Sequence, residues 1–242
     1  MVNQRFSRTA LIFGEEGMAM LQNSKIAIVG LGGVGSFAAE MLARSGVGTL
    51  ILVDFDKIGL TNINRQITAL TSTVGQLKVD VLASRLKDIN PDIDIVIAPI
   101  FCDDDSRDIF LSDANYIVDA IDSLNPKVGL LEYAYKAKIK VISCMGAANR
   151  LNPSLIRLDD ISRTTTCPLA LRVRKYLNKR GIFEGIPVVY SVEKPLALHT
   201  YNTIEDETLE RGRKRSTLGS TAHLPAAFAS WAVSYVLKDI AF

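Results

Sequence analysis

KIAIVGLGGVG, residues 25–35, places a glycine-rich turn directly after a short apolar run. The run Lys25–Gly30 predicts a buried strand, and Val34–Ser45 predicts a helix. Glycines between a strand and a helix let the backbone approach a phosphate, and the helix N-terminus supplies free N–H groups. We therefore expect this turn to bind a phosphate-bearing ligand. The glycines expected to contact that ligand are Gly30, Gly32 and Gly33.

Strand and helix patterns continue to alternate as far as Met145. Further strands are predicted at Thr49–Asp54, Asp94–Ala98, Asn115–Ala120 and Lys140–Cys144, and helices at Gly75–Asn90 and Leu124–Lys138. Apolar strands that alternate with helices indicate a parallel sheet covered on both faces. The predicted fold class is therefore α/β: a Rossmann-like, mostly parallel sheet with helices on both faces, plus a smaller C-terminal extension.

The pattern is less regular after Gly146. The elements predicted there are a helix at Cys167–Arg180, a strand at Pro187–Ser191 and a closing helix at Pro225–Ile240, whereas residues 195–222 show no clear periodicity. We assign residues 1–146 to a nucleotide-binding core and residues 147–242 to an extension that contains a substrate loop and the closing helix. Both parts are expected to belong to one folded unit.

The composition is that of an ordinary globular protein, and the cysteines and apolar runs indicate the compartment in which it works. The 28 Lys and Arg nearly cancel the 26 Asp and Glu, so the net charge of +2 argues neither for nor against nucleic acid. The three cysteines form no Cys-x-x-Cys pair of the kind that holds zinc. The chain shows no signal peptide and no apolar run of the about 20 residues that a bilayer span needs. We therefore expect a cytoplasmic protein with no membrane partner.

Polar residues that follow the phosphate turn distinguish between ligand classes. Asp54 ends the second predicted strand, where a carboxylate can hold ribose hydroxyls; the turn and this acid alone fit a nicotinamide or flavin enzyme equally well. A nucleoside triphosphate carries about four negative charges, whose neutralisation calls for cations and a metal-holding carboxylate together. Arg65, Lys78 and Asp122 supply that set, and NAD leaves them without a role. A module that only binds is disfavoured, because buried unpaired charges are costly without a ligand.

Five motifs together resemble a known family. GLGGVGS, VDFD, TNINRQ, VGQLKV and VDAIDS occur in the order and spacing of the adenylation domain shared by ubiquitin-activating enzymes and the thiamine- and molybdopterin-biosynthesis adenylyltransferases. The resemblance implies that residues 1–146 form an ATP-binding adenylation core that uses ATP and Mg²⁺. It further implies that Asp54 binds ribose and that Asp122 holds the metal. The other implied ATP contacts are Asp56, Asn62, Arg65, Gln66 and Lys78.

The N-terminal stretch Gln4–Thr9 is similar to the segment with which this family sends an arginine into the site of a partner subunit. Arg8 falls at the matching position, and Arg5 fits it less well. Most soluble oligomers are two-fold dimers, so the expected assembly is a homodimer whose sites Arg8 completes. The implied catalytic residues are Arg8, Arg65, Lys78 and Asp122.

Within this superfamily the chain resembles the tRNA threonylcarbamoyladenosine dehydratases. The stretches that carry this likeness are QRFSRT at residues 4–9, CMGAANRLNP at residues 144–153 and TTTCPLALRVRKYLNKRGI at residues 164–182. The likeness implies ATP-dependent dehydration of a threonylcarbamoyl group on tRNA. In that reaction the carboxylate of the group is adenylated and the group then closes into a ring.

An alternative function keeps every ATP residue but takes a protein as substrate, the C-terminus of a ubiquitin-like sulfur carrier. Many such activators hold zinc with Cys-x-x-Cys pairs, which this chain lacks; a sulfur-transfer protein remains a candidate partner.

Cys167 precedes a predicted helix whose N-terminus can lower its pKa for thioester chemistry, and the competing interpretation is a buried or capping residue. Charge runs are usually solvated surfaces. The basic candidates for tRNA contact are Arg172, Arg174, Lys175, Lys179 and Arg180, and Arg211, Arg213, Lys214 and Arg215.

Overall fold

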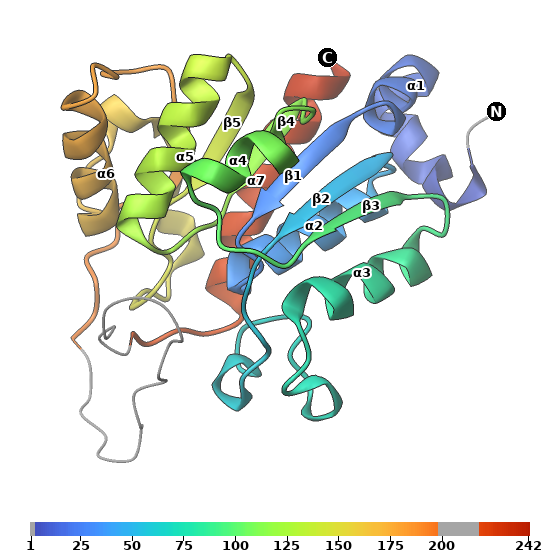
Figure 1. The fold of residues 1–242 in the computed structure, drawn as a ribbon, viewed down its shortest axis with the longest axis horizontal. Helices are drawn as coiled ribbons and strands as arrows, with labels where there is room; N and C mark the ends of the chain where they lie inside the picture. Colours follow the sequence, from blue (N-terminus) through green and yellow to red (C-terminus); the bar gives the residue numbers. More distant parts are fainter. Residues whose placement is uncertain (1–2, 198–217) are drawn as a thin grey trace.

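A computed structural model of the chain describes residues 3–197 and 218–242, and it places the strand before the glycine-rich turn inside a seven-stranded sheet (Figure 1). The strands are β1 (Lys25–Val29), β2 (Thr49–Val53), β3 (Asp94–Ala98), β4 (Tyr116–Asp119), β5 (Lys140–Cys144), β6 (Ile156–Asp160) and β7 (Pro187–Ser191). Their order in the sheet is β3-β2-β1-β4-β5-β7-β6. All neighbours run parallel except β6 and β7, so the predicted α/β class with a mostly parallel sheet is confirmed.

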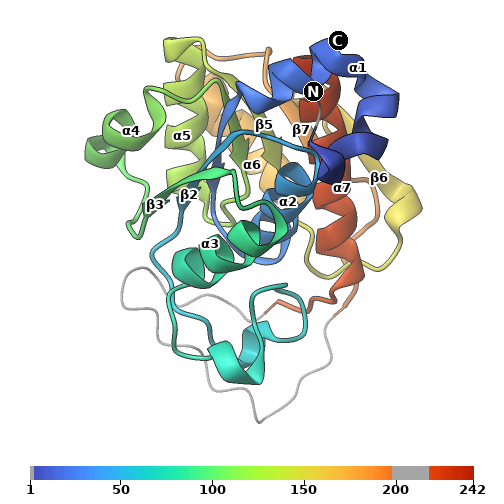
Figure 2. The ribbon, with the colours of Figure 1, turned by 90° about the vertical axis from the view of Figure 1, so that its right-hand side faces the viewer.

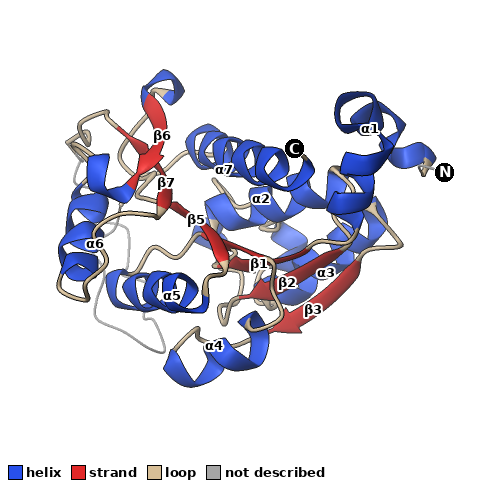
Figure 3. Cartoon of the chain, turned by 90° about the horizontal axis from the view of Figure 1, so that it is seen from above, coloured by secondary structure: helices blue, strands red, loops and turns tan. Residues whose placement is uncertain are grey.

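Helices cover both faces of this sheet (Figure 3). One face packs against α1 (Ser7–Gln22), α2 (Gly33–Arg44), α3 (Lys78–Ile89) and α7 (His223–Ala241), and the other against α4 (Asp104–Leu111), α5 (Leu124–Ala137) and α6 (Pro168–Asn178). Successive side chains of a strand point to opposite faces. Ile26 and Ile28 accordingly join the first core, whereas Ala27 and Val29 join the second. A strand buried on both faces needs such an unbroken apolar run.

Short 3₁₀ segments complete the described structure at Gln4–Phe6, Leu60–Asn62, Thr71–Thr73, Pro153–Leu155 and Ile161–Arg163. The helix predicted from Gly75 begins only at Lys78, because Gly75 has φ = +88°, which no right-handed helix accommodates. The helix predicted from Cys167 begins at Pro168, and Cys167 is its N-cap. None of the described helices is long and apolar enough to cross a membrane.

Three elements of the structure, α1, α4 and β6, were not predicted from the sequence. Helix α1 is broken by Gly14, whose φ of +71° interrupts the apolar periodicity. Strand β6 has the sequence IRLDD and pairs antiparallel with β7 at the edge of the sheet, where its polar side chains stay partly exposed. Because β6 and β7 extend the same sheet, the segment after residue 147 adds strands to the core.

The order of the strands fixes where a ligand can bind. The chain passes from β1 through α2 to β2 and then to β3, and it returns to place β4 on the other side of β1. In open α/β sheets this reversal opens a crevice at the carboxyl ends of the strands. The segment between β2 and α3 extends beyond that edge, and α1 lies at the opposite end of the molecule (Figures 1 and 2).

Candidate nucleotide site

The glycine-rich turn connects β1 to α2 at the carboxyl ends of the parallel strands, which we call the carboxyl edge of the sheet. Gly30 has φ = +90°, and a Cβ on it would lie 2.9 Å from the carbonyl oxygen of Ala120. A Cβ on Gly35 would lie 1.8 Å from the carbonyl oxygen of Gly30. A side chain at Gly30 would displace the loop after β4, and one at Gly35 would collide with the turn itself. Contact distances therefore require glycine at both positions, and the positive φ favours it at Gly30.

Asp54 directly follows β2, and its carboxylate links the end of that strand to the glycine-rich turn by a hydrogen bond. Its Oδ2 accepts a hydrogen bond from the Leu31 amide at 2.6 Å, and its Oδ1 accepts one from the Asp56 amide at 2.8 Å. Burial raises the pKa of this carboxyl above its ordinary value, and the charge of Lys78 opposes that shift. Each oxygen keeps acceptor capacity for a ribose hydroxyl.

Lys78, the first residue of α3, lies with its ammonium group among these acids. Its Nζ is 2.7 Å from Asp56 Oδ2 and 4.0 Å from Asp54 Oδ1, and its side chain is only 7% exposed. An ammonium has three donor hydrogens, so pairing with Asp56 leaves donors for phosphate oxygens. The structure thus brings Asp54, Asp56 and Lys78 together beside the glycine-rich turn.

The loop that carries TNINRQ packs onto the turn. A Cβ on Gly33 would lie 3.2 Å from the Arg65 carbonyl oxygen, and one on Gly32 would lie 4.0 Å from Gln66 Nε2. The Asn62 Oδ1 accepts from the Gly59 amide and shapes this loop. Gln66 Oε1 is buried without a hydrogen-bond partner among the residues described, as expected of an amide that awaits a ligand or water.

Arg65 makes hydrogen bonds within its own loop. Its guanidinium donates to the Thr61 carbonyl oxygen at 2.8 Å and to Asn64 Oδ1 at 3.0 Å, both within its own loop. The side chain is half-buried, and only one of its guanidinium nitrogens makes these two contacts.

Asp122 lies in the loop after β4 and is exposed. Ser123 Oγ donates to its Oδ1 at 3.2 Å. Within residues 3–197 and 218–242 no three His, Cys, Asp or Glu side chains gather as a metal cage. Mg²⁺ is usually held by one or two carboxylates together with substrate phosphates and water. A single carboxylate beside a phosphate-binding turn therefore fits Mg²⁺ bound together with ATP.

Arg8 is the one predicted catalytic residue that the chain does not bring to this edge. It is exposed near the start of α1, two residues after Phe6. A Cβ on Gly46 would lie 3.3 Å from the Phe6 ring, and Gly46 follows the carboxyl end of α2. The glycine-rich turn lies at the opposite end of that helix.

The sequence profile of the ThiF family matches residues 6–241. The chain belongs to the ThiF family. A curated relative, the tRNA threonylcarbamoyladenosine dehydratase of Bacillus subtilis, is 42% identical over 226 residues, which cover 93% of this chain and 87% of the relative. The Escherichia coli enzyme of the same name has been solved with AMP and with ATP. Those structures are 34% identical to this chain and cover 98% of it, with TM-scores of 0.87 and 0.85; the chain spans 94% and 93% of them.

All three cysteines of this ThiF family member are unpaired and buried. Burial raises the pKa of Cys102 to about 11 and that of Cys144 to about 12. Cys167 is 2% exposed at the N-cap of α6, beside a cavity of about 210 Å³ that is lined by Thr164, Thr165, Thr166, Pro168, Leu171 and Arg174. A thiol with so little exposure is poorly placed to receive an acyl group from a protein substrate.

The basic residues of α6 and of the two positions that follow it divide into two groups. Arg174 donates to the carbonyl oxygen of Thr164, and Arg180 pairs with Glu132, so both have protein partners. Lys179 lies over the Tyr176 ring and is exposed. Arg172 and Lys175 are also exposed. The second predicted basic group, Arg211, Arg213, Lys214 and Arg215, lies outside the described residues.

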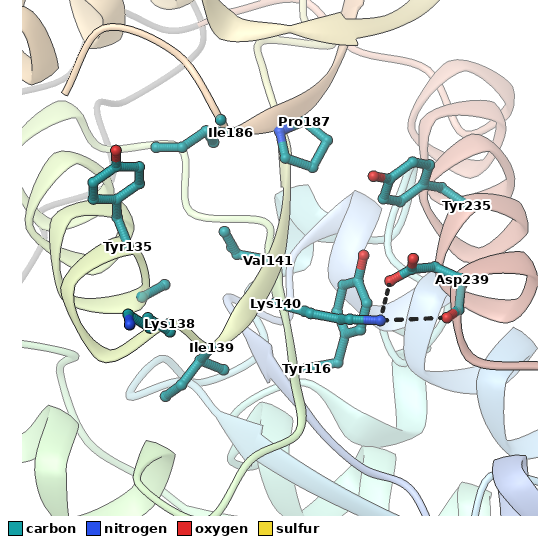
Figure 4. A pocket seen from close by; sticks show the side chains of 12 residues that line it. Tyr116, Tyr135, Lys138, Ile139, Lys140, Val141, Ile186, Pro187, Tyr235 and Asp239 are labelled. Carbon is teal, nitrogen blue, oxygen red and sulfur yellow. Dashed lines mark hydrogen bonds and ion pairs between the residues drawn. The ribbon is translucent and has the colours of Figure 1, made fainter.

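A cavity of about 330 Å³ opens at the other edge of the sheet, where β4, β5 and β7 begin (Figure 4). Lys140 Nζ lies 3.0 Å from Asp239 Oδ2 at its rim, near Tyr116 and Tyr235. Ligands of parallel sheets bind at the carboxyl ends of the strands. We therefore expect a nucleotide to bind at the opposite ends of the strands from this cavity.

Proposed function

We propose that this chain is an ATP-dependent tRNA threonylcarbamoyladenosine dehydratase. The observation that carries the proposal is the near-full-length likeness to dehydratases of that name, which extends through the segment after residue 147. A match to the adenylation core alone would fit any activator of carboxylates. The acids and lysine beside the glycine-rich turn supply the groups that ATP needs.

The chemistry proceeds in two steps. A threonyl carboxylate oxygen attacks the α-phosphate of ATP, the bond to the β-phosphate oxygen breaks, and pyrophosphate leaves. The neighbouring carbamoyl group then attacks the acyl carbon, loses its proton and expels AMP, so the group closes into a ring with net loss of water. Ring closure within one molecule gains from high effective molarity. A protein nucleophile is therefore not required.

We assign roles to the residues at the carboxyl edge. Asp54 accepts the ribose hydroxyls, and Asp56 keeps the Lys78 ammonium beside it. Lys78 and Arg65 neutralise the triphosphate. Asn62 holds the loop that presents Arg65 and Gln66 to the glycine-rich turn. Asp122 would hold Mg²⁺, which would supply positive charge to the pyrophosphate leaving group.

The proposal extends to assembly and setting. We assign the active form to a homodimer in which Arg8 of each chain reaches the site of the other. Apolar side chains exposed on α1 and at the end of α7 support this, with Leu11 87%, Ile12 70% and Phe242 81% exposed. A tRNA substrate places the reaction in the cytoplasm.

The deciding experiment is pyrophosphate exchange with two alternative substrates. We expect ATP-dependent exchange with tRNA that carries threonylcarbamoyladenosine, and a product lighter by one water in mass spectrometry of the digested tRNA. Unmodified tRNA is the matched control and should support no exchange. Exchange that instead requires a Gly-Gly-ended carrier protein would establish the alternative function, with a sulfur-transfer protein as the partner.

Cys167→Ala is expected to retain most dehydratase activity. The acyl-adenylate already activates the carboxylate, and the Cys167 thiol is buried. Turnover of modified tRNA by the purified variant measures this, with Cys102→Ala as the control for removing a buried thiol elsewhere. A thioester trapped at Cys167, or complete loss of turnover in a well-folded variant, would contradict the two-step route without a protein nucleophile.

A further inference from the structure

A fully buried polar cluster lies where β4 and β5 end. Lys127 Nζ donates to Asp119 Oδ2 at 2.6 Å, to Ser143 Oγ at 3.2 Å and to the Cys144 carbonyl oxygen at 3.0 Å. Ser143 Oγ in turn donates to Asp119 Oδ2 at 2.6 Å. The side chains of Asp119 and Lys127 are 0% exposed. The three hydrogens of the ammonium thus all have acceptors.

The cluster joins three elements at the carboxyl edge of the sheet. Asp119 is the last residue of β4, Ser143 and Cys144 end β5, and Lys127 lies in the first turn of α5. The second oxygen of Asp119, Oδ1, accepts from the Ile121 amide at 3.0 Å. The same carboxylate therefore shapes the turn that leads to Asp122.

That turn contacts the glycine-rich turn directly. The Ala120 amide donates to the Val29 carbonyl oxygen at 2.9 Å. A Cβ on Gly30 would lie only 2.9 Å from the Ala120 carbonyl oxygen and 3.1 Å from the Ile121 nitrogen. The loop after β4 therefore packs closely against the phosphate turn, and the hydrogen bonds of the cluster hold its start in place.

Stability alone does not account for this arrangement. Removing two charges from water is costly, and apolar replacements of buried ion pairs are often neutral or stabilising. A buried pair with directed hydrogen bonds does, however, fix backbone positions that apolar packing leaves less defined.

We propose that Asp119, Lys127 and Ser143 position the Asp122 carboxylate against the glycine-rich turn, so that Asp122 can hold Mg²⁺ bound together with ATP. This inference rests on the proposed function of Asp122. The three side chains are positioning residues, since they act through the backbone of residues 120–122.

The test is a binding measurement. Calorimetry gives the dissociation constant of ATP with and without Mg²⁺, and the ratio of the two is the gain that the metal supplies. Partners that orient a metal ligand typically change metal affinity by about 10- to 100-fold when mutated. We expect Lys127→Met to lower the gain by that factor while metal-free ATP affinity stays within about twofold.

Two further variants keep the proposal testable if Lys127→Met fails to fold. Lys127→Met leaves Asp119 buried without its cation, so Lys127→Met combined with Asp119→Asn removes both charges, and Ser143→Ala removes only the bridging hydroxyl. The matched control is Arg85→Met, which breaks an ion pair with Glu40 between α2 and α3. It should lower the melting temperature and leave the gain unchanged.

The outcomes separate this inference from the function on which it rests. If Asp122→Asn removes the gain but the Lys127 double variant and Ser143→Ala keep it, the cluster is only structural and the inference is wrong. If Asp122→Asn also keeps the gain, the metal-binding role of Asp122 is wrong and the inference falls with it. Lower melting temperatures with a wild-type gain in all cluster variants likewise overturn the positioning role.

Discussion

Asp122→Asn and Lys78→Ala are each expected to reduce ATP-dependent adenylation by about 10²–10³-fold, because each removes a group that stabilises charge as pyrophosphate departs. Lys78 is 7% exposed and lies among two acids, so its ammonium is held beside the phosphates before ATP arrives. Charges that are already in place and shielded from water act most strongly on a developing charge. Pyrophosphate exchange at saturating modified tRNA measures the loss.

Control variants remove similar charges elsewhere on the same elements. Asp113→Asn removes an exposed carboxylate just before β4, at the opposite edge of the sheet from Asp122. Lys87→Ala removes a lysine from the last turn of α3, the helix that begins with Lys78. Both controls should exchange at the wild-type rate. Near-normal exchange by Asp122→Asn or Lys78→Ala, with circular dichroism showing an intact fold, would refute the role assigned to that residue.

The elements that carry the nucleotide site could be predicted because their sequence patterns are local. After their first residues, Lys25–Val29 and Thr49–Val53 are unbroken apolar runs, and both were expected as strands within one residue of their bounds. A parallel sheet gathers the carboxyl ends of its strands at one edge. That geometry brings Asp54 to the Leu31 amide although 23 residues separate them.

The remainder depends on tertiary contacts that no local pattern records. A lysine in the first turn of a helix, such as Lys127, is expected from the sequence to be exposed. Its full burial depends on hydrogen bonds to Asp119 and Ser143, which come from two different strands. The hydrogen bonds of Arg65 to its own loop likewise depend on how that loop folds. Strand β6 escaped prediction because its partner β7 stabilises a polar sequence as an edge strand.

An equal mixture of Arg8→Ala and Lys78→Ala chains is expected to regain activity that neither variant has alone. Within one chain, Phe6 packs beyond the carboxyl end of α2, whereas the glycine-rich turn lies at its amino end. Helix α2 has 12 residues, so at 1.5 Å per residue these ends are about 18 Å apart. Arg8, two residues from Phe6, therefore needs a second chain to place it beside ATP.

The size of the rescue follows from two-fold symmetry. After free subunit exchange half of the dimers are mixed, and each mixed dimer has one intact site, so the mixture should reach about a quarter of wild-type activity. The matched control mixes Asp122→Asn with Lys78→Ala, whose changes fall in the same chain's site, and it should stay inactive. Light scattering establishes whether the chains dimerise at the working concentration. A monomeric chain, or an inactive Arg8→Ala and Lys78→Ala mixture of folded, exchanging dimers, would show that Arg8 does not complete the partner's site.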